Sequence, residues 1–133
     1  MTPPNVTHAK ILVVEDSMAD VVLIKQFFAT EKITNDISYA SSLGQARQLL
    51  RRQSFDICFV DVSLPDGEGF ELIADIDTEH TNVIILSGSD NMKYVIQAKC
   101  SGALAYIAKP LNKHMLDRLV KELKQLHWAI VVG

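Results

Sequence analysis

Five short runs of apolar, mostly β-branched residues recur along this chain, and a segment with helical spacing of apolar residues follows each one. The runs occupy residues 11–14, 37–40, 57–60, 83–86 and 104–107. The helical segments occupy residues 21–28, 43–50, 70–76, 92–96 and 115–126. Runs of this length and composition are typical of buried strands. The pattern therefore predicts strand followed by helix, five times over.

The predicted strands are apolar throughout and do not alternate with polar residues. Such strands are typical of a parallel sheet whose two faces are covered by helices joined through right-handed crossovers. The predicted fold class is therefore α/β, a doubly wound (βα)5 sheet of five parallel strands. In sheets of this kind ligands gather beyond the carboxyl ends of the strands.

Residues that favour helix ends agree with these limits. Ser17 followed by Asp20 resembles a capping box, in which each residue satisfies a backbone donor of the first turn. Ser42 and Asp90 can cap the second and fourth helices. Gly102 lies where a C-terminal cap is expected.

The length of 133 residues fits one domain with a substantial core. We expect residues 1–8 to be a flexible leader and residues 9–127 to be the folded domain. Residues 128–133 are unusually apolar for a chain end, so they could be a tail, the start of a linker or a docked helix end.

Composition excludes several classes of protein. A net charge of -3 gives no general attraction for nucleic acid, so direct binding of nucleic acid is not expected. No apolar run approaches the roughly eighteen residues of a membrane span, and the N-terminus lacks the apolar stretch of a signal peptide. Cys58 and Cys100 lack CxxC spacing and the four histidines lack zinc-ligand spacing. We therefore expect a cytoplasmic protein with no membrane association and no zinc site.

Polar side chains follow four of the five predicted strands. Glu15 and Asp16 follow the first strand, Asp61 the third, Ser87 the fourth and Lys109 the fifth. Two carboxylates 4 Å apart repel by about 4 kcal/mol at an effective dielectric near 20, so three in one pocket need a cation, and Mg²⁺ fits best. Lys109 and Ser87 could each pair with a phosphoryl oxygen. This set predicts a phosphoryl-accepting site with Asp61 as the nucleophile.

Each of these residues alone has a simpler interpretation. Acids after the first strand are common at helix starts, and Asp61 could be a turn residue, since residues 64–69 have the composition of a turn. Lys109 could be an exposed loop residue, Ser87 a helix cap and Tyr106 a core aromatic. Packing alone would rarely place acid, acid, hydroxyl and amine at four strand ends in this order, which favours the phosphoacceptor interpretation.

Four segments, KILVVED (10–16), VDVSLPDGEG (60–69), ILSG (85–88) and YIAKP (106–110), resemble the receiver domain family of two-component response regulators over residues 9–127. The resemblance implies the flavodoxin-like strand order 2-1-3-4-5 and a cis peptide bond between Lys109 and Pro110. The roles that it implies are Mg²⁺ binding by Glu15, Asp16, Asp61 and the Ser63 backbone carbonyl, phosphorylation of Asp61, phosphate pairing by Lys109, and switching by Ser87 and Tyr106.

The chain departs from the family's usual pattern at three places. Glu15 stands where an aspartate is also frequent, which lengthens one acidic arm. Ser87 and Gly88 stand where threonine and alanine are common, which affects the switching kinetics. Ser63 lies two residues past the acceptor, where its side chain could influence the lifetime of the phosphate.

The resemblance further implies a signalling domain that catalyses only its own phosphorylation and dephosphorylation, and is not otherwise an enzyme. The phosphoryl group would come from a phosphohistidine on a sensor histidine kinase or a histidine phosphotransfer protein. Movement of Ser87 and rotation of Tyr106 would then alter the face made by the fourth helix, fifth strand and fifth helix, which would contact a downstream effector, a fused output domain or a second copy of the chain.

Three other functions remain as alternatives. A pseudo-receiver would be a phosphorylation-independent interaction module, against which the nearly complete acid, serine and lysine set argues. A phosphohydrolase with an aspartyl-phosphate intermediate would be expected to have a second acid at position 63, which is serine. A flavin-binding relative would need a Ser-, Thr- and Gly-rich phosphate loop after the first strand, where the chain has Glu-Asp-Ser-Met.

Overall fold

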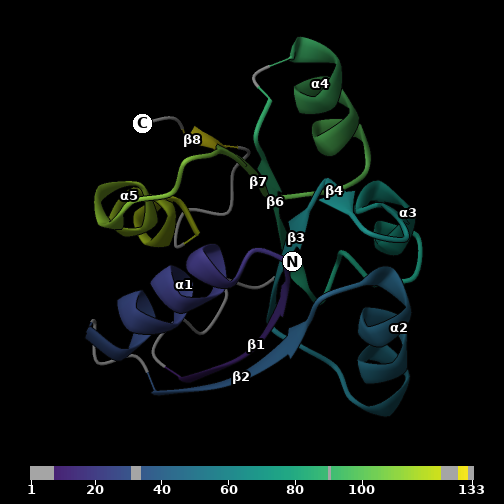
Figure 1. Ribbon diagram of the computed structural model, residues 1–133, viewed down its shortest axis with the longest axis horizontal. Helices are drawn as coiled ribbons and strands as arrows, with labels where there is room; N and C mark the ends of the chain where they lie inside the picture. The colour runs from purple at the N-terminus through teal and green to yellow at the C-terminus, as the bar shows by residue number, and fades with distance from the viewer. Residues whose placement is uncertain (1–7, 31–33, 90, 124–128, 132–133) are drawn as a thin grey trace.

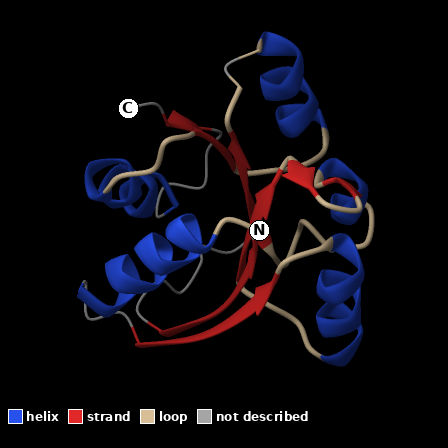
Figure 2. Cartoon of the chain, viewed as in Figure 1, coloured by secondary structure: helices blue, strands red, loops and turns tan. Residues whose placement is uncertain are grey.

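A single parallel sheet with helices on both faces forms the body of the molecule (Figures 1 and 2). The computed structural model describes residues 8–30, 34–89, 91–123 and 129–131. The strands of the main sheet are β1 His8–Val14, β2 Thr34–Ala40, β3 Ile57–Asp61, β6 Asn82–Ser87, β7 Ala105–Ala108 and β8 Ala129–Val131. All five neighbouring pairs are parallel and the order is β2-β1-β3-β6-β7-β8.

This order confirms the predicted α/β fold class and the predicted arrangement of the first five strands. Two elements are additional. The chain after β3 forms a short antiparallel hairpin from β4 Ser63–Leu64 and β5 Gly67–Glu68, within the segment that was expected to be a turn. A sixth parallel strand, β8, pairs with the outer edge of β7.

In the described part of the chain, five helices cover the sheet, namely α1 Met18–Thr30, α2 Leu43–Arg52, α3 Phe70–Ile73, α4 Met92–Cys100 and α5 Lys113–Leu123. Helices α1 and α5 lie on one face, and α2, α3 and α4 lie on the other (Figure 1). Helix α3 is shorter than the predicted segment 70–76, because its last bonds tighten to i→i+3 spacing at Asp75 and Ile76. Ile73 and Ile76 nevertheless remain buried, as their helical spacing predicted.

Two hydrophobic clusters, one on each face, hold the layers together. Successive residues of β1 divide between them, since side chains of a strand point alternately to opposite faces: Ile11 and Val13 pack with α1 and α5, whereas Leu12 and Val14 pack with α2, α3 and α4. This double burial explains why the strand is apolar throughout.

Of the four predicted helix caps, those at Ser42 and Gly102 are confirmed, and at Ser17 the hydroxyl accepts a bond from the Asp20 N–H, as in one half of a capping box. The Ser42 hydroxyl accepts a bond from the Gln45 N–H at 3.2 Å and caps α2. Gly102 follows α4 with a φ of 96°, a conformation that favours glycine. The expected cap at Asp90 lies outside the described residues, and the side chain of Asn91 caps α4 by accepting from the Lys93 N–H.

The two ends of the chain bear on the expected domain limits. Residues 1–7 of the expected leader lie outside the described residues, whereas His8 already belongs to β1. Within the expected tail, Ala129–Val131 form β8, and Val131 is buried in the core. Among the described residues, no helix is both long enough and apolar enough to cross a membrane.

Candidate functional site

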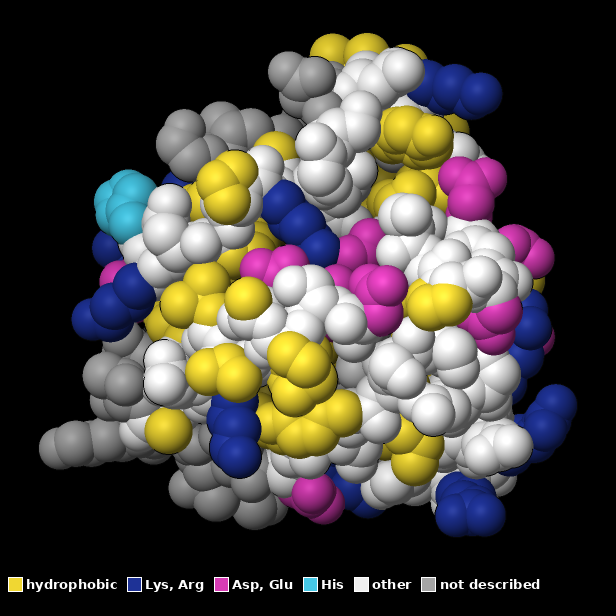
Figure 3. Space-filling view, viewed as in Figure 1, with side chains coloured by type: hydrophobic (Ala, Val, Ile, Leu, Met, Phe, Trp, Pro, Cys, Tyr) yellow, Lys and Arg dark blue, Asp and Glu magenta, His cyan; other side chains and the backbone are white. Residues whose placement is uncertain are grey.

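The carboxyl ends of neighbouring strands bring together the polar residues that the sequence singled out. Strands β1 and β3 are adjacent, so Glu15 and Asp16 lie beside Asp61. Lys109, from the segment after β7, reaches the same place. Figure 3 shows acidic side chains gathered around a Lys or Arg side chain near the middle of the face in view. This clustering follows from the parallel topology, which places all strand ends at one edge.

Lys109 is the cationic centre of this site. Its Nζ lies 2.7 Å from Glu15 Oε2, 2.5 Å from Asp61 Oδ2 and 2.9 Å from Asp20 Oδ2. Burial lowers the pKa of the ammonium, but its bonds to Asp61, Glu15 and Asp20 outweigh that effect and raise the pKa above its ordinary value. Lys109 therefore stays charged and compensates part of the negative charge around it.

Glu15 is buried and uses both of its carboxylate oxygens. Oε1 accepts a bond from the Ser17 N–H at 2.9 Å, and Oε2 accepts from Lys109. Burial and the neighbouring Asp61 raise the pKa of Glu15 to about 7, although the bonds from Lys109 and Ser17 act in the opposite direction. Burial and the excess of negative charge in the site therefore disfavour ionisation of the Glu15 carboxylate near neutral pH.

Asp61 is held at the end of β3 by contacts on both of its carboxylate oxygens. Oδ1 accepts from the Ser63 N–H at 2.8 Å, and Oδ2 accepts from Lys109. The backbone of Gly69, just before α3, lies very close to the backbone of Asp61: a Cβ on Gly69 would lie only 2.0 Å from the Asp61 carbonyl oxygen. The acceptor candidate is thus positioned from three sides, while 7% of its side chain stays exposed.

The oxygen ligands of the site fit a hard divalent cation. Glu15, Asp16 and Asp61 each offer a carboxylate oxygen, and these three atoms lie within 4.8 Å of one another. An all-carboxylate set with one exposed member, Asp16, suits Mg²⁺, which keeps several waters. The Ser63 N–H bond to Asp61 places the Ser63 backbone beside this set, while its carbonyl as a metal ligand stays a prediction.

Ser87 and Tyr106 meet at the loop that follows β6. Ser87 is buried, and its hydroxyl accepts a bond from the Ser89 N–H at 3.1 Å. Tyr106 is also buried, and its hydroxyl donates to the Ser89 carbonyl. Tyr106 therefore already occupies an inward position in this structure and joins β7 to the loop between β6 and α4. Its role as a switch stays a prediction.

Asp20 is the one member of the Lys109 network that the sequence analysis did not place in the site. Its position after Ser17 indicated a helix cap, and no local pattern distinguishes a capping carboxylate from one that turns toward a distant lysine. The implied cis bond between Lys109 and Pro110 is present.

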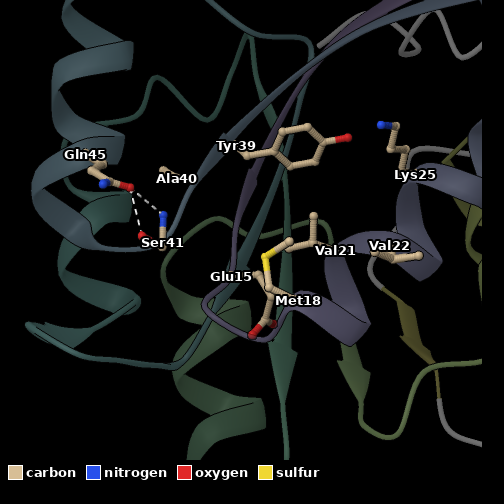
Figure 4. A pocket seen from close by; sticks show the side chains of 9 residues that line it. All are labelled: Glu15, Met18, Val21, Val22, Lys25, Tyr39, Ala40, Ser41 and Gln45. Carbon is tan, nitrogen blue, oxygen red and sulfur yellow. Dashed lines mark hydrogen bonds between the residues drawn. The ribbon is translucent and has the colours of Figure 1, made fainter.

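A hollow of about 320 Å³ adjoins the site between α1 and β2 (Figure 4). Its walls are mainly apolar, with Met18 and Val21 of α1 facing Tyr39 of β2, and Glu15 lines it beside Met18. Met18 is 70% exposed and Tyr39 is 39% exposed, so an apolar surface lies directly beside the acidic cluster.

Comparison with known proteins gives a consistent result. Residues 11–121 match the family model described as the response regulator receiver domain. The response regulator protein PilR of Pseudomonas aeruginosa is 32% identical over 116 residues, which cover 86% of this chain and 26% of PilR. The TorCAD operon transcriptional regulatory protein TorR of Escherichia coli is 30% identical over 122 residues, which cover 90% of this chain and 50% of TorR.

Among solved structures, a CheY-like response regulator receiver domain protein from Methanospirillum hungatei has a TM-score of 0.75 and 26% identity, over 90% of this chain and 96% of that one. The chain thus spans a quarter to a half of the length of the two curated relatives, but nearly all of this structural neighbour.

Proposed function

This chain belongs to the response regulator receiver domains of two-component systems, and from this premise we propose that Asp61 accepts a phosphoryl group from a phosphohistidine donor. Receiver domains are signalling domains that act as phosphorylation-dependent switches. The proposal that Asp61 is the phosphoryl acceptor rests on the contact of Asp61 Oδ2 with Lys109 Nζ, beside two further acids. It joins a carboxylate nucleophile to a cation that can follow the transferred charge.

In the proposed transfer, a carboxylate oxygen of Asp61 forms a bond to phosphorus while the bond from phosphorus to the histidine nitrogen breaks. The imidazole leaves with the electron pair and takes up a proton. Ser63 N–H and Lys109 orient the Asp61 carboxylate for this attack. Mg²⁺ bound by Glu15, Asp16, Asp61 and the Ser63 carbonyl would supply positive charge to the phosphoryl oxygens.

The proposed switch passes through the loop after β6. Ser87 can exchange its bond from the Ser89 N–H for one to a phosphoryl oxygen, which would alter the loop that Tyr106 also contacts. The face formed by α4, β7 and α5 would then change its affinity for an effector or a fused output domain. A homodimer through the same face would have to accommodate β8, which pairs with the outer edge of β7.

The proposed donor is a sensor histidine kinase or a histidine phosphotransfer protein. Support comes from the apolar hollow beside the acidic cluster, since exposed Met18, Val22 and Tyr39 offer a protein partner contact area next to Glu15. A cytoplasmic location and the lack of direct nucleic-acid binding stay predictions from the sequence.

A pseudo-receiver is a second candidate because of one observation. Lys109 already has three carboxylate partners, so the network could stabilise the fold without any phosphate chemistry. The two functions differ in their response to phosphoryl mimics.

The deciding experiment titrates Mg²⁺ with and without beryllofluoride while thermal stability is followed. A receiver should gain about 2.7 kcal/mol at a ligand concentration 100 times the dissociation constant. Asp61→Asn should abolish the beryllofluoride response, whereas Asp36→Asn, at an exposed position on β2, makes the same charge change and should keep it. A folded wild-type protein without any response would favour the pseudo-receiver.

A further inference from the structure

Asp20 is placed in the site by α1, of which it is the third residue. Its Oδ2 lies 2.9 Å from Lys109 Nζ, and its side chain is 19% exposed. Glu15 and Asp61, the other partners of Lys109, are 0% and 7% exposed. Asp20 is therefore the outermost of the three carboxylates that hold the lysine.

The carboxylate of Asp20 is not used to cap its own helix. In a capping box the acid at this position would accept a bond from the backbone N–H of the cap residue. Here the Ser17 N–H donates to Glu15 Oε1 instead, at 2.9 Å. The other half of the box remains, since the Ser17 hydroxyl accepts from the Asp20 N–H at 3.4 Å. Glu15 thus frees the Asp20 carboxylate to pair with Lys109.

The pairing leaves Lys109 fully engaged. An ammonium group has three N–H donors, and Lys109 has three carboxylate partners within 2.9 Å. A phosphoryl oxygen on Asp61 can take over the hydrogen bond that Lys109 now donates to Asp61 Oδ2, whereas a second bond from Lys109 to the phosphoryl group requires Glu15 or Asp20 to give one up. Glu15 is buried, so Asp20 is the partner most easily displaced.

Asp20 also makes the rim of the site more negative. Together with Glu15, Asp16 and Asp61 it forms a group of four carboxylates, and in the described part of the chain Lys109 is the cation that contacts this group. An incoming phosphodonor is itself an anion, so an additional carboxylate near its path opposes its approach.

We propose that Asp20 is a positioning and specificity-determining residue that restrains Lys109 and disfavours small, highly anionic phosphodonors. It acts through its ion pair with Lys109 and through its charge. This inference rests on the proposed phosphorylation of Asp61. It assigns to α1 a function in choosing the donor, in addition to its packing against the sheet.

The test compares two small phosphodonors of different charge with wild-type protein and Asp20→Asn, at saturating Mg²⁺ and low salt. With acetyl phosphate, a dianion, the P–O bond to acetate breaks as Asp61 is phosphorylated, and acetate leaves. With phosphoramidate, which has one net negative charge, the P–N bond breaks and ammonia leaves. Initial rates of phosphorylation are measured by mass spectrometry of the intact protein.

In a water-like dielectric, a carboxylate about 6 Å from the phosphoryl group repels each negative charge of the donor. This repulsion lowers the rate of phosphorylation by about threefold for each charge. Asp20→Asn should therefore accept phosphate about tenfold faster from acetyl phosphate and about threefold faster from phosphoramidate. The difference between donors should shrink at high salt, because salt screens exposed charges. A merely structural ion pair would change both rates by the same factor.

Two variants serve as controls. Asp20→Glu keeps the charge and should stay within about twofold of the wild-type rates. Asp36→Asn removes a charge at an exposed position on β2 and should change neither rate. Circular dichroism establishes that each variant is folded.

Equal factors for both donors, or slower phosphorylation of Asp20→Asn, would overturn this inference while leaving the proposed function in place. If the folded wild-type protein takes phosphate from neither donor and does not respond to beryllofluoride, the proposed function fails as well. The two failures are therefore distinguishable.

Discussion

Replacement of Gly69 by alanine should be among the most damaging small substitutions in this protein. Gly69 precedes α3 with a φ of -58°, which any residue can adopt, so backbone conformation does not require glycine there. Space does. A Cβ at this position would lie 2.0 Å from the Asp61 carbonyl oxygen, 2.7 Å from Val60 Cγ1 and 2.9 Å from the Asp61 carbonyl carbon.

Two of these three atoms belong to the backbone of β3 in the middle of the sheet, so they cannot move aside as a flexible side chain would. Overpacking of a well-packed core costs about 1–3 kcal/mol, and a clash with backbone belongs at the upper end or above it. We expect Gly69→Ala to lower the free energy of unfolding by about 3 kcal/mol, a large part of the roughly 5–15 kcal/mol of a typical domain.

The assay is urea denaturation of wild-type protein, Gly69→Ala and Gly88→Ala under the same conditions. Gly88 is the matched control, because an added Cβ there meets no atom within 4 Å. Gly88→Ala should be neutral or stabilising by up to about 1 kcal/mol, since alanine restricts the unfolded chain. A loss of less than about 1 kcal/mol in Gly69→Ala, or equal effects of the two variants, would refute the argument from close approach.

Two further predictions follow from the site. Because burial raises the pKa of Glu15 from 4.5 to about 7, its contribution to stability is fully present below pH 4.5 and is lost as pH rises to about 7. In urea denaturation, metal-free wild-type protein should therefore lose up to about 3 kcal/mol of its free energy of unfolding over this range. If Glu15→Gln shows the same dependence of stability on pH, the raised pKa does not belong to Glu15. Tyr106→Phe removes the bond to the Ser89 carbonyl and should cost about 1 kcal/mol, and equal stability of the two proteins would show that this bond contributes nothing.

Much of the fold could be predicted because its signals are local. The apolar run of β1 is long enough to read as a strand by itself, and its lack of alternation follows from burial on both faces of the sheet. Elements with weaker local signals were missed. The hairpin of β4 and β5 has two residues in each strand, and β8 is defined by its pairing with β7, which no local pattern reports.

The candidate site divides in the same way. Glu15, Asp16, Asp61 and Lys109 could be predicted to meet, because parallel strands place their carboxyl ends at one edge and each of these residues follows a strand directly. The hydrogen bonds of Ser87 and Tyr106 to Ser89 depend on the path of a loop, for which the sequence contains no comparable rule.

By itself, the sequence determined the class of fold, the family and the identity of the acidic and basic groups at the strand ends, because these depend on residue type and short-range spacing. Tertiary structure alone decided that Asp20 turns away from its own helix start to Lys109, and that Gly69 presses against Asp61. The first contact joins elements that are far apart in the sequence, and the second forms where the chain folds back after β3; the distances in both are set by how α1 and α3 pack on the sheet. Packing of this kind depends on the whole core, so no segment of the chain encodes it separately.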